Sequence, residues 1–146
     1  MEDWIKAIDR DKPDTLTMGG GEPLSVPWAI ELIKTFPEVQ WSLSTNGLDT
    51  DAITELAKIR LFQIININLS YHPEAARRYA WYFEQWKQEI SLLARAGYNI
   101  SSNIEKANGN VENSKNAIEW MKKVNLPMLI SPICGGRVEL SKPQPK

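Results

Sequence analysis

Residues 15–47 read TLTMGGGEPLSVPWAIELIKTFPEVQWSLSTNG, and the rest of the chain repeats their pattern. A short run of alternating polar and apolar residues, Thr15 to Met18, ends in three glycines, Glu22 and Pro23. A segment with apolar residues at helical spacing follows, and a second alternating run begins at Gln40. We predict from this order a strand, a loop, a helix and a second strand, the unit from which parallel sheets are built.

The same unit recurs along the whole chain. A helix-periodic segment follows each of the first four strand-like runs, which is typical of an α/β domain with about five parallel strands and helices on the outer face. The predicted runs begin near Thr15, Gln40, Ile64, Tyr98 and Met128.

Residues typical of helix ends support the predicted helices. Ser25 is expected to cap the first, with Pro27 in its first turn, and Asp49 or Thr50 to cap the next. One long helix is predicted over 73–96, with Gly97 at its end. We interpret its apolar stripe as core packing rather than a surface for stacking nucleotides; the stripe consists of Tyr79, Phe83, Trp86, Ile90 and Leu93.

Alternation within the runs predicts a sheet with one apolar and one polar face. In the third run Ile65, Ile67 and Leu69 are expected on the helix-covered face, opposite Asn66, Asn68 and Ser70, and the neighbouring runs alternate in the same way. One interpretation is a half-exposed sheet whose polar face meets water. We favour another, a partial (βα) barrel whose concave side is a polar ligand cavity, with the polar residues at the strand ends converging on the ligand.

Composition limits the classes of partner. At 146 residues and 42% hydrophobic, the chain suits one domain, which we place at 1–134 with a flexible C-terminal tail over 135–146. The 17 basic and 18 acidic residues nearly cancel, which argues against nucleic acid and anionic membranes as partners. We expect a cytoplasmic protein, because no apolar run is long enough to span a bilayer and the first residues lack a signal-peptide pattern.

The glycine-rich loop after the first run suits a cationic amine. Gly20 and Gly21 permit positive φ and close approach of backbone carbonyls to a ligand, and Pro23 restricts the direction of the Glu22 carboxylate. Carbonyls and a carboxylate match an ammonium group, which has three donors and no acceptor. Glu22 disfavours a phosphate at this position. A tight turn that merely needs glycine is the structural alternative.

Three motifs follow successive predicted strands, namely TMGGGEP at 17–23, LSTNG at 43–47 and NLS at 68–70. In these motifs, and in the spacing of the helices between them, the chain resembles the radical S-adenosylmethionine enzymes. This resemblance implies that Gly20, Gly21 and Glu22, followed by Pro23, receive the methionine ammonium of S-adenosylmethionine. It further implies that the carboxylate or ribose is contacted by residues at the next strand ends, namely Ser44 or Asn46, Ser70, and Ser101 or Asn103. The family activity is reductive cleavage of S-adenosylmethionine to a 5′-deoxyadenosyl radical.

The chain departs from that family at the metal. Family members hold a four-iron four-sulfur cluster with three cysteines in a CxxxCxxC loop, whereas Cys134 is the one cysteine here, so no metal ligands are predicted. We expect the first strand and cluster loop to be missing and the chain to be inactive by itself, unless a second polypeptide or further sequence supplies them. Trp4 and Ile8 are expected to help shield the resulting edge at Thr15.

Two other interpretations remain open. In the first, the chain is a cluster-free protein that binds S-adenosylmethionine or serves as a partner without catalysis. In the second, it is an unrelated sugar- or nucleotide-binding α/β domain. His72, the one histidine, is expected at the start of a helix on the same rim, with contact to substrate as a further role.

Overall fold

The computed structural model describes residues 1–106 and 111–132, and Cys134 and the tail predicted over 135–146 lie outside these ranges. It contains a five-stranded sheet in the order β1-β2-β3-β4-β5, with every neighbouring pair parallel. The α/β class and the five parallel strands are therefore confirmed. The strands are β1 (Thr15–Met18), β2 (Gln40–Thr45), β3 (Ile64–Leu69), β4 (Ile100–Lys106) and β5 (Met128–Pro132).

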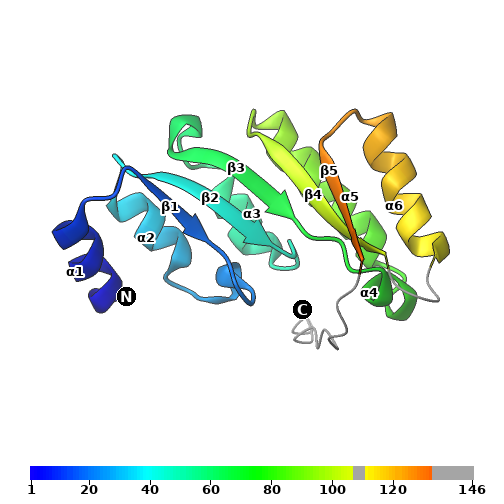
Figure 1. The fold of residues 1–146 in the computed structure, drawn as a ribbon, viewed down its shortest axis with the longest axis horizontal. Coiled ribbons are helices and arrows are strands. Elements are labelled where there is room, and N and C mark those ends of the chain that lie inside the picture. The colour runs from blue at the N-terminus through cyan, green and yellow to red at the C-terminus, as the bar shows by residue number, and fades with distance from the viewer. Residues whose placement is uncertain (107–110, 133–146) are drawn as a thin grey trace.

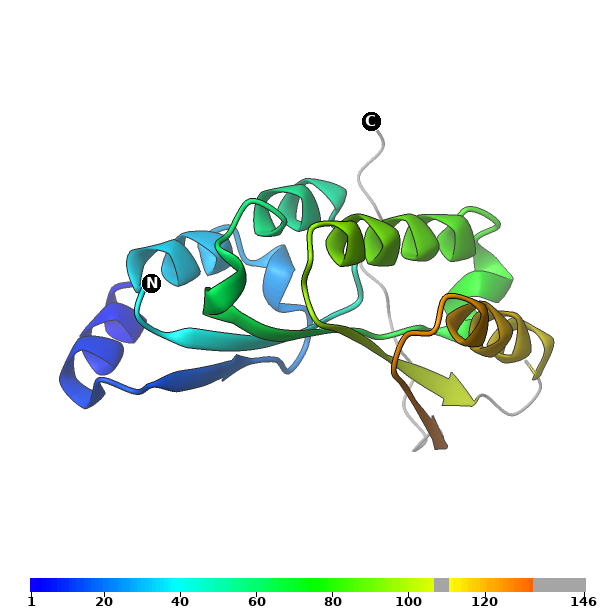
Figure 2. The same cartoon turned by 90° about the horizontal axis from the view of Figure 1, so that it is seen from above.

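The helices form one layer on one face of this sheet (Figures 1 and 2). Figure 2 shows the sheet bowed, with the helix-free face on the inside of the curve. Helices in the described ranges are all too short or too polar to cross a membrane. The α-helices are α1 (Glu2–Asp11), α2 (Ala29–Thr35), α3 (Thr50–Leu56), α4 (Pro73–Arg78), α5 (Tyr82–Arg95) and α6 (Val111–Lys123), and the two 3-10 turns are η1 (Pro23–Ser25) and η2 (Leu61–Gln63).

The core lies between the sheet and this helix layer. Apolar side chains of the three central strands meet apolar faces of α2, α3, α5 and α6, and their burial supplies most of the driving force for folding. Trp86 of α5 is buried, and its ring makes a tilted contact with Tyr71 and an edge contact with Trp120, so the predicted stripe does belong to the core. Fully buried members include Ile33, Leu43, Ile53, Leu56, Ile67, Leu69, Ile90, Leu93, Ile100, Ile104, Ala117 and Met121.

Two helix predictions were wrong in detail. The long helix predicted over 73–96 is two helices, α4 and α5, because Tyr79 adopts an extended conformation (φ −127°, ψ 106°) and interrupts the hydrogen-bond ladder. The break lets Tyr82 turn into the core. Ser25 does not cap a helix of its own: it closes η1, with its hydroxyl on the Glu22 carbonyl, and α2 starts four residues later.

Two other helix ends agree with the sequence. The Asp49 carboxylate accepts the Ala52 amide at 2.9 Å and caps α3. Gly97 follows α5 with φ 95°, a left-handed conformation that favours glycine.

The predicted face of Ile65 was also wrong. Trp41 pairs with Ile64 but Ser42 pairs with Asn66, so Ile65 is an extra residue in β3, a bulge. Ile64 takes the buried position, and the Ile65 side chain is 44% exposed. Beyond the bulge the predicted parity holds, because Ile67 and Leu69 are buried and Asn66 and Asn68 are half-buried.

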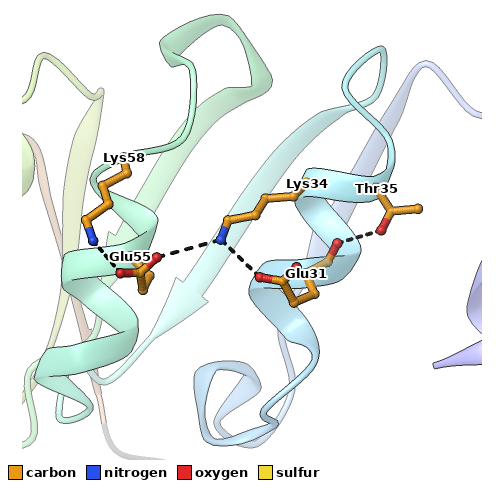
Figure 3. A network of polar contacts seen from close by, with 5 residues as sticks. All are labelled: Glu31, Lys34, Thr35, Glu55 and Lys58. Atoms are coloured by element: carbon orange, nitrogen blue, oxygen red, sulfur yellow. Dashed lines mark hydrogen bonds and ion pairs between the residues drawn. The ribbon is translucent and has the colours of Figure 1, made fainter.

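Exposed ion pairs link α2 to α3 (Figure 3). Lys34 contacts Glu31 at 3.0 Å and Glu55 at 3.6 Å, and Glu55 also pairs with Lys58. The hydrogen bond from Lys58 lowers the pKa of the Glu55 carboxyl. Because exposed pairs of this kind contribute little to stability, the buried faces of the two helices hold the layer together.

Candidate functional site

The C-terminal ends of β1 and β2 are joined by one carboxylate. Glu22 Oε1 accepts hydrogen bonds from Thr45 Oγ1 at 2.5 Å and from the Leu24 amide at 3.1 Å, and Glu22 Oε2 accepts one from the Asn46 amide at 2.6 Å. We call this arrangement the Glu22 latch. It fixes the loop after β1 to the loop after β2, as the sequence predicted for two loops at one rim.

The glycines make the latch possible. Gly20 and Gly21 have φ values of 80° and 64°, a region that side chains with a Cβ disfavour, so the predicted positive φ is confirmed. They bend the chain after β1, and Glu22 follows in an extended conformation as the residue that precedes η1. A Cβ atom built on Gly20 or Gly21 would meet nothing within 4 Å. The backbone at these two residues is therefore open to a ligand.

The Glu22 carboxylate points toward the helix side of the rim rather than toward the polar face. Its partner Thr45 shares the face of Trp41 and Leu43 and is only 3% exposed. A carboxylate offers about four acceptor positions, and three of those of Glu22 are occupied within the chain. The structure thus makes Glu22 a residue that positions the loop, while Gly20 and Gly21 are exposed.

The loops after β2 and β3 continue the rim. Asn46 Oδ1 accepts the Leu48 amide at 3.0 Å, which forms a tight turn, and the Ser70 amide donates to the Thr45 carbonyl at 2.9 Å. Gly47 adopts φ 68°, a conformation that favours glycine, and a Cβ atom at this position would crowd Leu69 Cδ2 at 3.0 Å. Ser44 is half-buried on the polar face and lies beside Gly19. The structure therefore brings together the candidates from the first three strands.

The polar face carries a hydrogen-bonded amide and hydroxyl group at its centre. Asn66 Nδ2 and Asn68 Nδ2 lie 3.2 and 3.1 Å from Ser101 Oγ, so this group crosses from β3 to β4. Asn103 is half-buried two residues farther along β4, and its carbonyl accepts the Tyr71 amide at 2.8 Å. Asn103 thus lies beside the end of β3, one strand away from Ser70. The part of the sequence that the structure describes places no helix over this face.

His72 lies at the far end of this rim. It precedes Pro73 at the start of α4, which confirms its predicted place, and its Nδ1 is 3.4 Å from Glu105 Oε2. Tyr82 Oη accepts the His72 amide at 3.0 Å and is 3.5 Å from the Ser70 carbonyl. Burial raises the pKa of the Tyr82 hydroxyl, so it remains a neutral donor.

Glu89 is a buried acid that was not predicted from the sequence. It belongs to α5, is 3% exposed and lies beside the loop that contains Gly47. Burial raises the pKa of its carboxyl to about 7, opposed by a hydrogen bond with Thr50 and assisted by the charge of Asp49. Its spacing from Tyr82, Trp86 and Leu93 was the available signal, because a charged residue at these positions faces the core.

Comparisons with known proteins add no identity. No protein-family model matches the chain, and no curated protein sequence matches it. Within 1–106 and 111–132, no group of three or more His, Cys, Asp or Glu side chains is placed to hold a metal ion.

Proposed function

We propose that this protein binds S-adenosylmethionine at the C-terminal rim of its sheet, as a radical S-adenosylmethionine-like domain whose sheet forms a partial barrel. The observation that carries the proposal is the Glu22 latch, which holds the open glycine backbone next to the end of β2. The curved sheet with amides and hydroxyls on its inner face is consistent with it (Figure 2).

The ammonium of the ligand would be received by backbone carbonyls at Gly20 and Gly21. Three N–H donors suit a ring of carbonyl acceptors, and the Glu22 carboxylate nearby in the same loop adds a favourable negative potential. The methionine carboxylate and the ribose would then extend over the polar face toward Ser44, Asn46, Ser70 and Asn103. Hydroxyl and amide groups can donate to the carboxylate and accept from the ribose, which a purely acidic face could not do.

The residues of this chain do not fit an iron–sulfur cluster. A single cysteine cannot supply three thiolates, and the described residues hold no alternative group of ligands. We therefore derive no radical step from this chain and propose binding as its own contribution. In this proposal, radical formation requires cluster ligands that the given sequence does not contain, supplied by a second polypeptide or by further sequence.

Calorimetric titration with S-adenosylmethionine tests the proposal. We compare the wild-type chain with Glu22→Ala, and with Glu38→Ala as a control, because Glu38 is an exposed carboxylate before β2 at the opposite end of the sheet. Loss of the latch should release the loop and weaken binding at least about tenfold, equivalent to about 1.4 kcal/mol, whereas Glu38→Ala should leave it unchanged. Absence of binding heat with the wild-type chain would contradict the proposal.

A second titration, with adenosine, distinguishes an unrelated nucleoside-binding domain. The Glu22 carboxylate points toward the helix side, so a nucleoside bound on the polar face would not contact this carboxylate. This orientation is the observation that supports a nucleoside-binding domain. Such a domain should bind adenosine as tightly as S-adenosylmethionine and be insensitive to Glu22→Ala. Asn68→Leu, which places an apolar side chain on the polar face, should weaken both ligands under either hypothesis.

A further inference from the structure

An apolar cleft of about 240 Å³ opens along the unpaired side of β1. It lies on the helix side of the sheet, because Leu16 and Met18 pair in register with Trp41 and Leu43, which are buried on that side. Its walls come from α1, β1 and α2, from Trp41 of β2, and from the chain between β1 and α2, which includes Gly20 and Glu22 of the candidate site. The residues that matter most below are Trp4, Ile8, Leu16, Met18, Leu32 and Trp41.

Helix α1 projects beyond the edge of the sheet. Figure 1 shows it on the outer side of β1, and Figure 2 shows it on the side of the other helices. Ile8 is buried against the core, but Trp4 is 56% exposed although it lines the cleft. Both residues thus lie beside the β1 edge, and of the two only Ile8 is buried. The helix therefore covers the cleft beside the outer edge of β1, where the sheet has no further strand.

The backbone of β1 is ready to pair at this edge. The Gln40 amide donates to the Asp14 carbonyl, so in the parallel pattern Asp14, Leu16 and Met18 direct their amide and carbonyl groups toward β2. Thr15 and Thr17 therefore direct theirs outward. The strand contains no charge, proline or bulge, the features by which exposed edges usually avoid pairing.

We propose that an extended segment of another polypeptide binds here as a sixth strand on β1. Its backbone pairs with Thr15 and Thr17, and apolar side chains at every second position enter the cleft beneath α1 and contact Trp41. Apolar side chains are favoured because the lining contains one carboxylate, Glu22, and no basic residue among the described residues. This mode of recognition combines main-chain hydrogen bonds with pockets for alternate side chains.

The position of α1 also argues against a second copy of this chain as the partner that pairs with β1. Two copies paired through β1 by a two-fold axis normal to the sheet would both carry α1 past the shared edge on the same side, and these helices would compete for the same space (Figure 2). A single strand brings no helix with it. Binding of such a strand does not require S-adenosylmethionine.

Selection from a displayed library of random ten-residue peptides, with the whole chain as bait, tests the proposed strand site. We expect enriched peptides to share apolar residues at alternate positions. The best synthetic peptide should slow hydrogen exchange of the Thr15 and Thr17 amides at least about tenfold.

Two variants should each weaken binding of this peptide at least about tenfold. Trp4→Glu puts a charge at the cleft, and Thr17→Pro removes an outward amide. Trp81→Glu is the control, since Trp81 is also exposed but lies before α5.

Three results would overturn the inference. Enriched peptides could lack alternation, or they could bind Trp4→Glu as tightly as the Trp81→Glu control. Sedimentation could also reveal a dimer of the wild-type chain that Thr17→Pro dissociates, which would make a second copy the occupant. Circular dichroism and thermal melting of each variant establish that it is folded before binding is compared.

Discussion

At the scale of single residues, Glu89 shows how a buried acid ties the stability of this domain to pH. Its carboxyl has a pKa of about 7 in the folded chain, against an ordinary value of 4.5. The folded state therefore binds more protons than the unfolded state between these values, and the stability contributed by the neutral form is lost as pH rises through this window. A shift of this size corresponds to about 3 kcal/mol at most.

We predict that Glu89→Gln removes this dependence. The free energy of unfolding of the variant should equal that of the wild type near pH 4 and exceed it by up to about 3 kcal/mol at pH 8, because Gln retains an acceptor for Thr50 without a charge to bury. Urea unfolding followed by circular dichroism at several pH values measures this free energy. Glu84→Gln, an exposed acid on the same helix, is the control and should leave the pH profile unchanged. Equal profiles for wild type and Glu89→Gln would refute the prediction.

At the scale of elements, the bulge in β3 separates two isoleucines that the sequence pattern treats alike. Ile65 is 44% exposed and Ile67 is completely buried. We predict that Ile67→Ala lowers the free energy of unfolding by about 2 to 5 kcal/mol, because it leaves a cavity in the core. Ile65→Ala should cost less than about 1 kcal/mol. Urea titration of the two variants measures the difference, and similar losses would mean that the bulge is misplaced.

The same bulge shows what the sequence could predict about these elements and what it could not. Alternation of Ile67 with Asn66 and Asn68 predicted the faces of β3 correctly, since pleating leaves no other choice once the register is set. The register itself depends on the neighbouring strand, and no local signal in Ile64–Ile65 marks the extra residue. The break at Tyr79 was missed for the same reason: the aromatic spacing continues through it, whereas the packing of Tyr82 against Tyr71 needs the chain to turn.

In the candidate site too, some features could be predicted from the sequence and others could not. Which loops meet could be predicted, because parallel strands that follow one another along the chain bring their C-terminal ends to one rim. The positive φ of Gly20 and Gly21 was likewise within reach. The direction of the Glu22 carboxylate was not, since it depends on Thr45 and Asn46, two residues whose donors become available only when β1 and β2 pair.

At the scale of the whole molecule, stability should decrease from the centre of the sheet toward the β1 edge. Leu43 and Ile67 of the central strands are almost completely buried, whereas no residue of β1 is. In helix α1 only Ile8 is buried, and Ile5 packs against the core while partly exposed. Few buried contacts and an unpaired edge are the features of segments that open without global unfolding.

We predict a matching gradient in native-state hydrogen exchange. Amides of Leu16 and Met18, which face β2, should exchange at least about tenfold faster than those of Leu43 and Ile67, a difference of about 1.4 kcal/mol in opening free energy. The opening of β1 should also depend weakly on urea, because it exposes little surface, while the central amides follow global unfolding. Equal protection and equal urea dependence would show that β1 and α1 unfold together with the core. The gradient would then be absent. A bound strand would in that case slow amide hydrogen exchange across the whole sheet rather than at its edge.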